Sequence, residues 1–152
     1  MVLITLLRHA PLALEHQNRY IGHTDIDIDL SLTDISKLDN IKNRNYDYIY
    51  PSDLKRCTQT LDLINLDYKK DKRLREIKFK DEYECKSFSE VEKLDSYSIK
   101  HLSSMESWHK FIAEENFDSF KNRIKTFLDE LPKEGDILIC SHGGTIKMLH
   151  SI

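Results

Sequence analysis

Residues 135–144 read GDILICSHGG, and this stretch indicates how the whole chain is organised. Asp136 to Cys140 form a short apolar run, which predicts a buried strand. Gly143 and Gly144 then lead into a final helix. Two glycines let the backbone approach a ligand closely, and their N–H groups open a helix N-terminus, which attracts anions. His142 stands between this strand and this turn, although a simple tight turn without a ligand fits the segment equally well.

The start of the chain repeats this arrangement of a strand followed by a histidine. Val2 to Leu7 form an apolar run rich in β-branched residues and without polar alternation. That pattern is typical of a strand buried on both faces of a parallel sheet. Arg8 and His9 follow this strand directly. Because ligands bind beyond the carboxyl ends of such strands, we expect His9 and His142 on the same ligand-binding rim.

Strands alternate with helices along the rest of the chain, which predicts an α/β fold. We expect a single three-layer domain over residues 1–152, with a mainly parallel central sheet flanked by helices. Residues 68–79 are expected to be extended, and residues 81–113 to form an irregular excursion over the site. The remaining expected elements are a helix capped by Ser31 or Thr33, a strand at 46–50, a helix capped by Ser52, and an amphipathic helix from Phe117 to Leu131.

Composition narrows the classes of function. The 152 residues carry a net charge of −3 and no long basic tract, which argues against nucleic-acid binding. No run approaches ~18 consecutive apolar residues, so no membrane span is expected. Cys57, Cys85 and Cys140 are widely spaced and form no CxxC pair, so neither a disulfide framework nor a zinc site is indicated. We therefore expect reduced thiols in a cytoplasmic protein; the oligomeric state is left open.

Four side chains have the chemistry of a phosphate site. The planar guanidinium of Arg8 suits phosphate oxygens, and the imidazole of His9 can accept a phosphoryl group. Arg56 falls in the first turn of the helix after the second strand, where it can point at the same rim. Glu76 ends the extended segment. Each of these residues taken alone is also explained as an ordinary surface or structural side chain.

Taken in order, the motifs resemble the histidine phosphatase (phosphoglycerate mutase-like) superfamily, nearest its small bacterial branch of α-ribazole phosphatases and broad-specificity phosphatases. The resemblance covers essentially the whole chain. Its four segments are a strand ending in Arg8-His9, Ser52-Asp-Leu-Lys-Arg56 with Gln59-Thr60, Leu74-Arg-Glu76, and Cys140-Ser-His-Gly-Gly144. Asn18-Arg19-Tyr20 and the Glu115-to-Ile124 helix resemble further parts of the family pattern.

The resemblance implies a mechanism and a set of roles. His9 is expected to attack phosphorus in line and become phosphohistidine, and Glu76 to protonate the leaving alcohol. The substrate implied is a small phosphate monoester, hydrolysed without cofactor or metal ion. The groups expected to hold the phosphoryl oxygens are the side chains of Arg8, Arg56 and His142 and the backbone N–H of Gly143.

Three departures from the family pattern bear on the substrate. Ala10-Pro11 replace the usual glycine and acidic residue after the nucleophile. Glu15 stands where the family commonly places an asparagine at the phosphate, and a carboxylate there would repel the substrate. We therefore expect Glu15 either to turn away from the phosphate or to be tolerated because Arg8 and Arg56 overcompensate its charge. The stretch from Phe79 to Cys85 also differs from the family's sequence after the acid.

Three other functions remain open at this stage. A phosphoglycerate mutase is disfavoured because the chain has no room for the usual mutase insertions. A phosphohistidine phosphatase acting on proteins is disfavoured because those short relatives generally lack the acid that Glu76 supplies. A module that binds a phosphorylated ligand without turnover finds support in Glu15 and in Ala10-Pro11.

Overall fold

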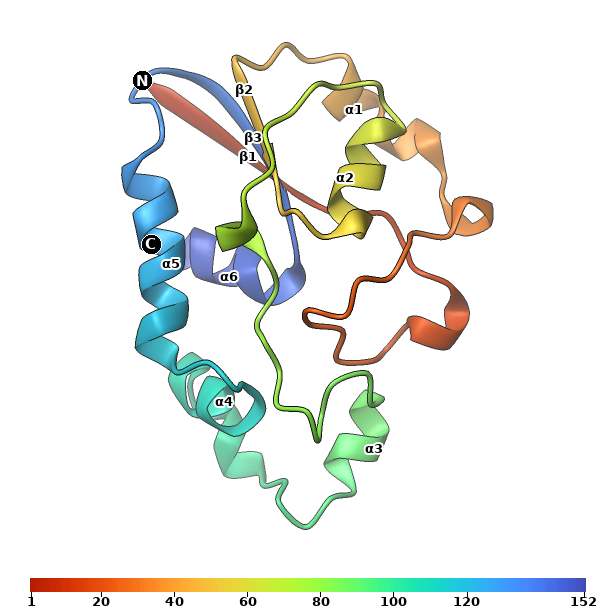
Figure 1. The fold of residues 1–152 in the computed structure, drawn as a ribbon, viewed down its shortest axis with the longest axis vertical. Coiled ribbons are helices and arrows are strands. Elements are labelled where there is room, and N and C mark those ends of the chain that lie inside the picture. The colour runs from red at the N-terminus through yellow and green to blue at the C-terminus, as the bar shows by residue number, and fades with distance from the viewer.

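The computed structural model describes residues 1–152 as an open three-stranded parallel sheet with helices on both faces (Figure 1). Its strands are β1 (Val2–Arg8), β2 (Tyr48–Pro51) and β3 (Gly135–Ser141). They lie in the order β1-β3-β2, so the last strand of the chain is the central one. Val2 pairs with Gly135 and Arg8 with Ser141, which brings the first and last strands of the chain side by side.

The helices lie on and beyond this sheet. Their bounds are α1 Asp39–Lys42, α2 Lys55–Asp62, α3 Phe88–Glu92, α4 Met105–Ile112, α5 Phe117–Asp129 and α6 Gly143–Ser151. Short 3-10 turns cover Leu14–His16, Leu30–Leu32, Ile35–Leu38, Lys72–Leu74 and Ile99–Leu102. None of the helices combines the length and the apolar character that a membrane crossing requires.

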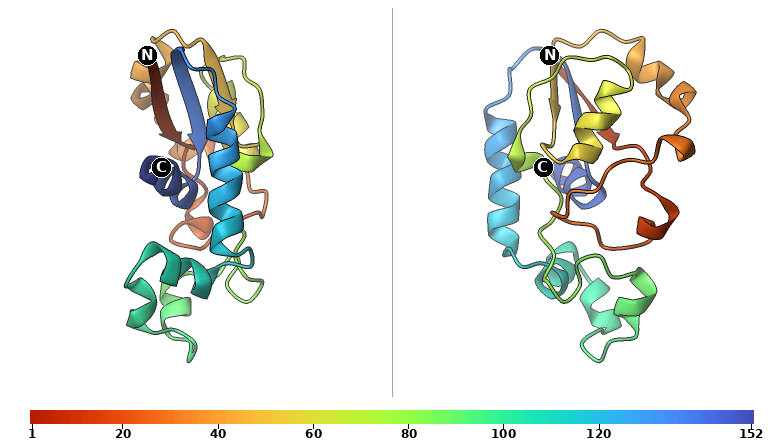
Figure 2. Two further views of the ribbon diagram at one scale, coloured as in Figure 1. Left: turned by 90° about the vertical axis from the view of Figure 1, so that its left-hand side faces the viewer. Right: turned by 45° about the vertical axis from the view of Figure 1, so that its right-hand side comes forward.

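Helices lie on both sides of the sheet (Figure 2). The alternation of side chains along β3 joins these layers to the sheet. Leu138 and Cys140 point to one face and pack with apolar residues of α2. Ile137 and Ile139 point to the other face and join the larger core cluster, which includes residues of α5 and α6. All four side chains are fully buried. The predicted α/β domain with a parallel sheet flanked by helices is thus confirmed.

The first strand differs from its prediction. The sequence predicts burial of β1 on both faces, but β1 is an edge strand that pairs only with β3. Its first residues remain exposed, with Leu3 retaining 46% of its accessible surface. The apolar run suggests a central position, but strand order depends on long-range pairing that composition does not encode.

Two helix starts also differ from the predictions. Neither Ser31 nor Thr33 caps a helix; the segment forms 3-10 turns, and Asp34 caps the turn that precedes the four-residue α1. Ser52 does not cap α2, whose N-cap is Leu54 without a side-chain hydrogen bond. The Ser52 hydroxyl instead accepts from the Leu54 N–H and contacts His142.

The excursion at residues 81–113 forms short helices beyond the carboxyl ends of the strands (Figure 1). Ser87 and Glu90 form a capping box at the start of α3, and Ser104 caps α4. These caps satisfy the first backbone N–H groups of helices too short to be stable alone. The excursion is therefore ordered although its sequence shows no long periodic pattern.

Candidate active site

A cavity of about 670 Å³ opens at the carboxyl ends of β1 and β3. Arg8 and His9 reach it from the end of β1, and His142 from the residue after β3. Arg56 enters from the first turn of α2. The structure brings every residue of the predicted site to this one cavity, whose lining includes Arg8, His9, Arg56, Glu76, His142 and Gly143.

His9 has one ring nitrogen fixed by the protein and the other free. Its Nδ1 lies 2.8 Å from the carbonyl oxygen of Ala10, which can only accept, so the proton resides on Nδ1. Nε2 therefore carries the lone pair, and no protein group hydrogen-bonds it. Burial, together with the charges of Arg56 and Arg8, lowers the pKa of His9 to about 4. The imidazole is therefore neutral at pH 7, as a nucleophile must be.

His142 is engaged on both ring nitrogens. The Nε of Arg56 donates to Nδ1 at 3.2 Å, so the imidazole proton lies on Nε2. Nε2 lies 2.9 Å from the hydroxyl oxygen of Ser52, to which it donates. Burial, with the nearby charge of Arg56, holds the pKa of His142 well below its usual range. In this arrangement His142 is a neutral ring that orients Arg56, and its nitrogens reach a phosphate only if the ring turns.

The two arginines of the site have different surroundings. Arg56 is 1% exposed, and its guanidinium donates to the carbonyls of Thr24 at 2.8 Å and Gly22 at 2.6 Å. The side chain of Arg8 is exposed at the cavity and makes no hydrogen bond or ion pair with the protein. Arg8 therefore has its full set of N–H donors available for an anion. Arg56 donates to carbonyl oxygens of the loop that follows His9, so fewer of its N–H groups remain available for an anion.

Glu76 holds the N-terminus of α6. Its Oε2 accepts from the Gly144 N–H at 3.0 Å, and its Oε1 accepts from the Thr145 N–H at 3.1 Å. The Ile77 N–H donates to Oε1 as well. The anion site predicted at this helix start is thus occupied by a carboxylate of the protein itself, which leaves the Gly143 N–H toward the cavity. Oε2 carries a single hydrogen bond, so it keeps a lone pair for a proton.

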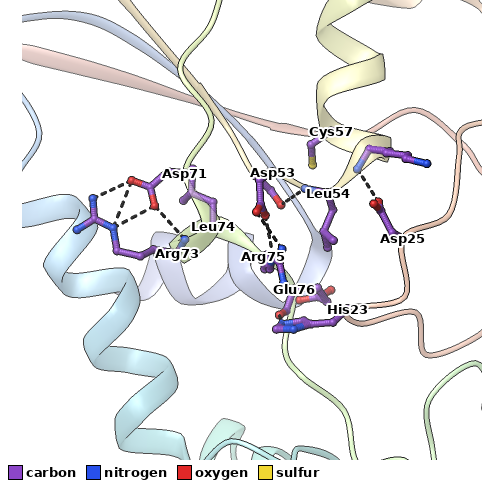
Figure 3. A network of polar contacts seen from close by, with 12 residues as sticks. His23, Asp25, Asp53, Leu54, Cys57, Asp71, Arg73, Leu74, Arg75 and Glu76 are labelled. Atoms are coloured by element: carbon purple, nitrogen blue, oxygen red, sulfur yellow. Dashed lines mark hydrogen bonds and ion pairs between the residues drawn. The ribbon is translucent and has the colours of Figure 1, made fainter.

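The segment that carries Glu76 is anchored on both sides (Figure 3). Arg75 forms a bidentate pair with Asp53, at 2.6 and 2.9 Å, which ties the segment to the start of α2. His23 lies 2.9 Å from the Glu76 carbonyl oxygen and donates to it from Nε2. The backbone of Glu76 is therefore positioned by the loop whose carbonyls also hold Arg56.

Arg123 of α5 fixes the same segment from behind. Its guanidinium donates to the carbonyl oxygens of Arg73, Arg75 and Glu76, at 2.7, 2.8 and 3.0 Å. The carboxylate of Glu115 pairs with it at 2.8 and 3.1 Å. One largely buried guanidinium thus satisfies three carbonyls of an irregular segment that has no strand partner of its own.

The charges around the cavity favour an anion. Four arginine or lysine side chains line it, opposed by the single carboxylate of Glu76, although the whole chain has a net charge of −3. Glu15 is not in the lining; its side chain is 77% exposed and lies 3.7 Å from His16. The expectation that Glu15 points away from the site agrees with this geometry. The four cations are Arg8, Arg19, Arg56 and Lys147.

Comparison with known families identifies the superfamily of the chain. The family model of the histidine phosphatase superfamily (branch 1) matches residues 4–152. The chain belongs to this superfamily. The resemblance seen in the ordered motifs is thereby confirmed, and with it the coarse functional class, which consists of phosphatases and mutases. No curated protein sequence matches the chain.

Solved structures share the histidine phosphatase fold at low identity. The TTHB049 protein of Thermus thermophilus is 22% identical, with a TM-score of 0.73 over 95% of this chain and 81% of that one. A protein of Escherichia coli K-12 described as a "putative alpha-ribazole-5'-P phosphatase" is 21% identical, with a TM-score of 0.75 over 97% of this chain and 77% of that one. Phosphoglycerate mutase from Bacillus anthracis str. Sterne is 19% identical, with a TM-score of 0.73 over 96% of this chain and 77% of that one. These likenesses establish the fold.

Sequence reasoning missed part of this histidine phosphatase site, and it named Asn18 and Tyr20 only as parts of the family pattern, without placing them at the cavity. Gln17 and Asn18 line the cavity, and Asn18 has a φ of 58°, a left-handed conformation that asparagine tolerates better than most residues. Lys147 of α6 also lines it, one helical turn after Gly143. The larger omission is an aromatic wall, formed by Tyr20, Phe79, Phe88 and Trp108. Helical or strand periodicity in the sequence does not reveal these residues, because they lie in loops and short helices.

Proposed function

We propose that this chain is a phosphomonoester hydrolase that works through a phosphohistidine intermediate on His9. The observation that carries the proposal is the state of that ring. Nδ1 is tied to the Ala10 carbonyl and Nε2 is free, and the unpartnered guanidinium of Arg8 lines the same cavity. A neutral nucleophile among fixed positive charges suits attack on a phosphate dianion.

The proposed reaction has two in-line steps. The lone pair of His9 Nε2 forms a bond to phosphorus while the bond from phosphorus to the ester oxygen breaks, and Glu76 gives its proton to the departing alkoxide. Water then attacks the phosphohistidine as Glu76 takes a proton from it. The P–N bond breaks and inorganic phosphate leaves. Arg8, Arg56 and the Gly143 N–H stabilise the charge on the phosphoryl oxygens, and His142 keeps Arg56 in place.

The substrate proposed is a small phosphorylated metabolite, with an α-ribazole phosphate-like compound as a candidate. The proposal includes no metal ion, because the arginines supply the positive charge that phosphoryl transfer needs. Nucleic acid and membrane are not proposed as partners. We also place the activity in the cytoplasm, a proposal supported by three free cysteines.

Hydrolysis of p-nitrophenyl phosphate with and without EDTA tests this function. We expect release of inorganic phosphate that EDTA does not reduce. Rapid-quench labelling should yield an acid-labile, alkali-stable phosphoenzyme. Activity that disappears with EDTA and returns with magnesium or zinc would contradict the mechanism. Isomerisation of 3-phosphoglycerate without release of inorganic phosphate would instead indicate a mutase.

A non-catalytic module that binds phosphorylated ligands is a second candidate, and one observation favours it. The Glu76 carboxylate already accepts from three backbone N–H groups, and Arg56 is committed to backbone carbonyls. Such a module would bind inorganic phosphate or vanadate, a change measurable by calorimetry, but would give no phosphoenzyme. Labelling of the wild-type chain therefore separates the two candidates.

A further inference from the structure

The cavity has a second half that phosphoryl transfer does not use. Part of its wall is made of aromatic rings that contact one another through Tyr20. The ring centroid of Tyr20 lies 4.7 Å from that of Phe88, 5.5 Å from that of Phe79 and 5.7 Å from that of Trp108. The rings come from three separate parts of the chain: the loop after β1, the segment after Glu76, and the excursion at residues 81–113.

Phe79 belongs to the core cluster and Tyr20 and Trp108 pack against it, but the wall also presents aromatic surface to the cavity. The core cluster below them contains fully buried residues such as Val91 and Ile112, whereas Phe88 keeps 42% of its accessible surface. Tyr20 and Trp108 are half-buried and also face the cavity. Exposed aromatic surface in a concave site is costly to leave in water, and grouping it in one place is typical of a binding site.

The space also exceeds what a phosphate needs. A cavity of about 670 Å³ lies within the range that holds a whole small-molecule ligand. With the phosphoryl group beside His9 and Arg8, the remaining volume faces the aromatic rings. Those rings offer flat apolar faces, so they favour a leaving group that is itself flat and apolar.

We propose that this aromatic wall is a subsite for the alcohol part of the substrate, and that the substrate is a phosphate monoester whose alcohol carries a flat aromatic or heteroaromatic ring. The ring stacks on Trp108 and Phe88 while the phosphoryl group lies among the cations. This inference rests on the proposed function for the reaction, but the binding it describes is measurable without turnover.

Trp108 supplies a direct probe because it is the sole tryptophan of the chain. We would titrate the protein with 2-(4-nitrophenyl)ethylphosphonate, a non-hydrolysable compound whose nitroaromatic ring quenches tryptophan on contact. The expected result is saturable quenching of Trp108 fluorescence, reversed by excess vanadate. Two other phosphonates, 2-cyclohexylethyl and n-butyl, are measured by displacement of the first. The aromatic compound should bind about 10- to 100-fold more tightly than both, the range expected for stacking one ring.

A matched pair of variants locates the effect. Phe88→Ala removes an exposed ring from the wall, and Leu102→Ala removes an exposed side chain of the same excursion that lies outside the cavity lining. We expect Phe88→Ala to reduce the preference for the aromatic over the n-butyl phosphonate by about fivefold or more, and Leu102→Ala to leave the preference unchanged. The conservative Phe88→Tyr should restore it.

Turnover is measured with the matching esters, 2-phenylethyl phosphate and n-butyl phosphate, whose leaving alkoxides have similar basicity. A preference in KM for the aromatic ester supports the subsite. Equal binding of the cyclohexyl and aromatic phosphonates, or no quenching of Trp108, overturns it even if both esters are hydrolysed. Stacking and quenching without hydrolysis of either ester would leave the subsite standing and overturn the proposed function.

Discussion

The rim at the strand ends and the excursion at residues 81–113 build two halves of one cavity in different ways. The rim is placed by β1, β3 and the first turns of α2 and α6, and its side chains are held by buried hydrogen bonds such as Arg56 to His142. The excursion supplies Phe88 and Trp108 from helices of five and eight residues. The comparison teaches that the reaction and the choice of substrate rest on different parts of the fold. A substitution in one part should therefore leave the function of the other part intact enough to measure.

The sharpest separation of the two halves comes from His9→Ala. Because this change removes the atom that bonds to phosphorus, hydrolysis of every phosphate ester should disappear, whatever its leaving group. Rapid-quench labelling should show no phosphoenzyme. Quenching of Trp108 by the nitroaromatic phosphonate should persist, since the aromatic wall is untouched. Labelling of His9→Ala equal to that of the wild type would place the nucleophile elsewhere.

Glu76→Gln should separate the leaving groups rather than the two halves. The amide keeps the shape but cannot deliver a proton, so alkyl phosphates should slow by about 10²–10⁴-fold. Formation of the phosphoenzyme from p-nitrophenyl phosphate should suffer less, because nitrophenolate departs without a proton. Phosphohistidine should then accumulate, since its hydrolysis still lacks a base. Equal slowing of both substrates without accumulation would assign the acid to another residue.

Gly144→Ala tests whether the exact place of Glu76 matters. A Cβ on Gly144 would lie 2.7 Å from the Glu76 Oε1, closer than real contacts allow, so the carboxylate must move. We expect kcat for alkyl esters to fall by roughly 10-fold or more, with little change in their KM. Gly143→Ala is the matched variant, because its Cβ would meet only the Arg8 Cζ at 3.9 Å. Comparable losses in the two variants would show that the helix start, and not Glu76, is sensitive.

The pH dependence should distinguish the buried rim from an ordinary surface histidine. His9 must be neutral to attack, and burial lowers its pKa to about 4. Because the neutral form persists above that pH, phosphoenzyme formation from p-nitrophenyl phosphate should change by no more than about twofold between about pH 7 and pH 5. A histidine with the unperturbed pKa would lose about 25-fold over the same range. Stopped-flow release of nitrophenolate measures this rate.

The smallest effect is expected at Glu15. The side chain lies outside the cavity and is mostly exposed, so Glu15→Asn should leave kcat/KM within about twofold of the wild type. The measurement is a steady-state assay with p-nitrophenyl phosphate, supported by a thermal melt that shows the fold intact. A collapse of activity in a folded variant would reveal a role in substrate binding that the structure does not indicate.

How far the sequence could predict the molecule also differs between the two halves. The rim was accessible because strands and helices have periods, and a histidine directly after a parallel strand must lie at the sheet's carboxyl edge. The expectation that β1 is buried on both faces was wrong, because β1 is an edge strand that pairs only with β3, a strand at the far end of the chain. The aromatic wall was not predicted, since Tyr20 and Trp108 meet only through the tertiary fold.

Some contacts at the rim could also not be predicted from the sequence. The position of Ser52 before α2 suggests a helix cap, but its hydroxyl accepts from the ring of His142. The glycine turn at the start of α6 suggests donors free for phosphate, whereas Glu76 accepts from Gly144 and Thr145. In both cases a local rule named a plausible partner, and a side chain distant in sequence took that place.

The central position of β3 has a consequence for how the molecule assembles. Both β1 and β2 pair only with β3, which follows them in the chain and is therefore synthesised after both. A nascent chain that lacks residues 135–141 therefore has no pair of strands to hydrogen-bond, however complete its helices are. Closing so long a loop makes such pairing slow. The sheet must therefore form late in folding, and the cavity between His9 and His142 forms with it. This topology has no partly folded state in which the site is complete.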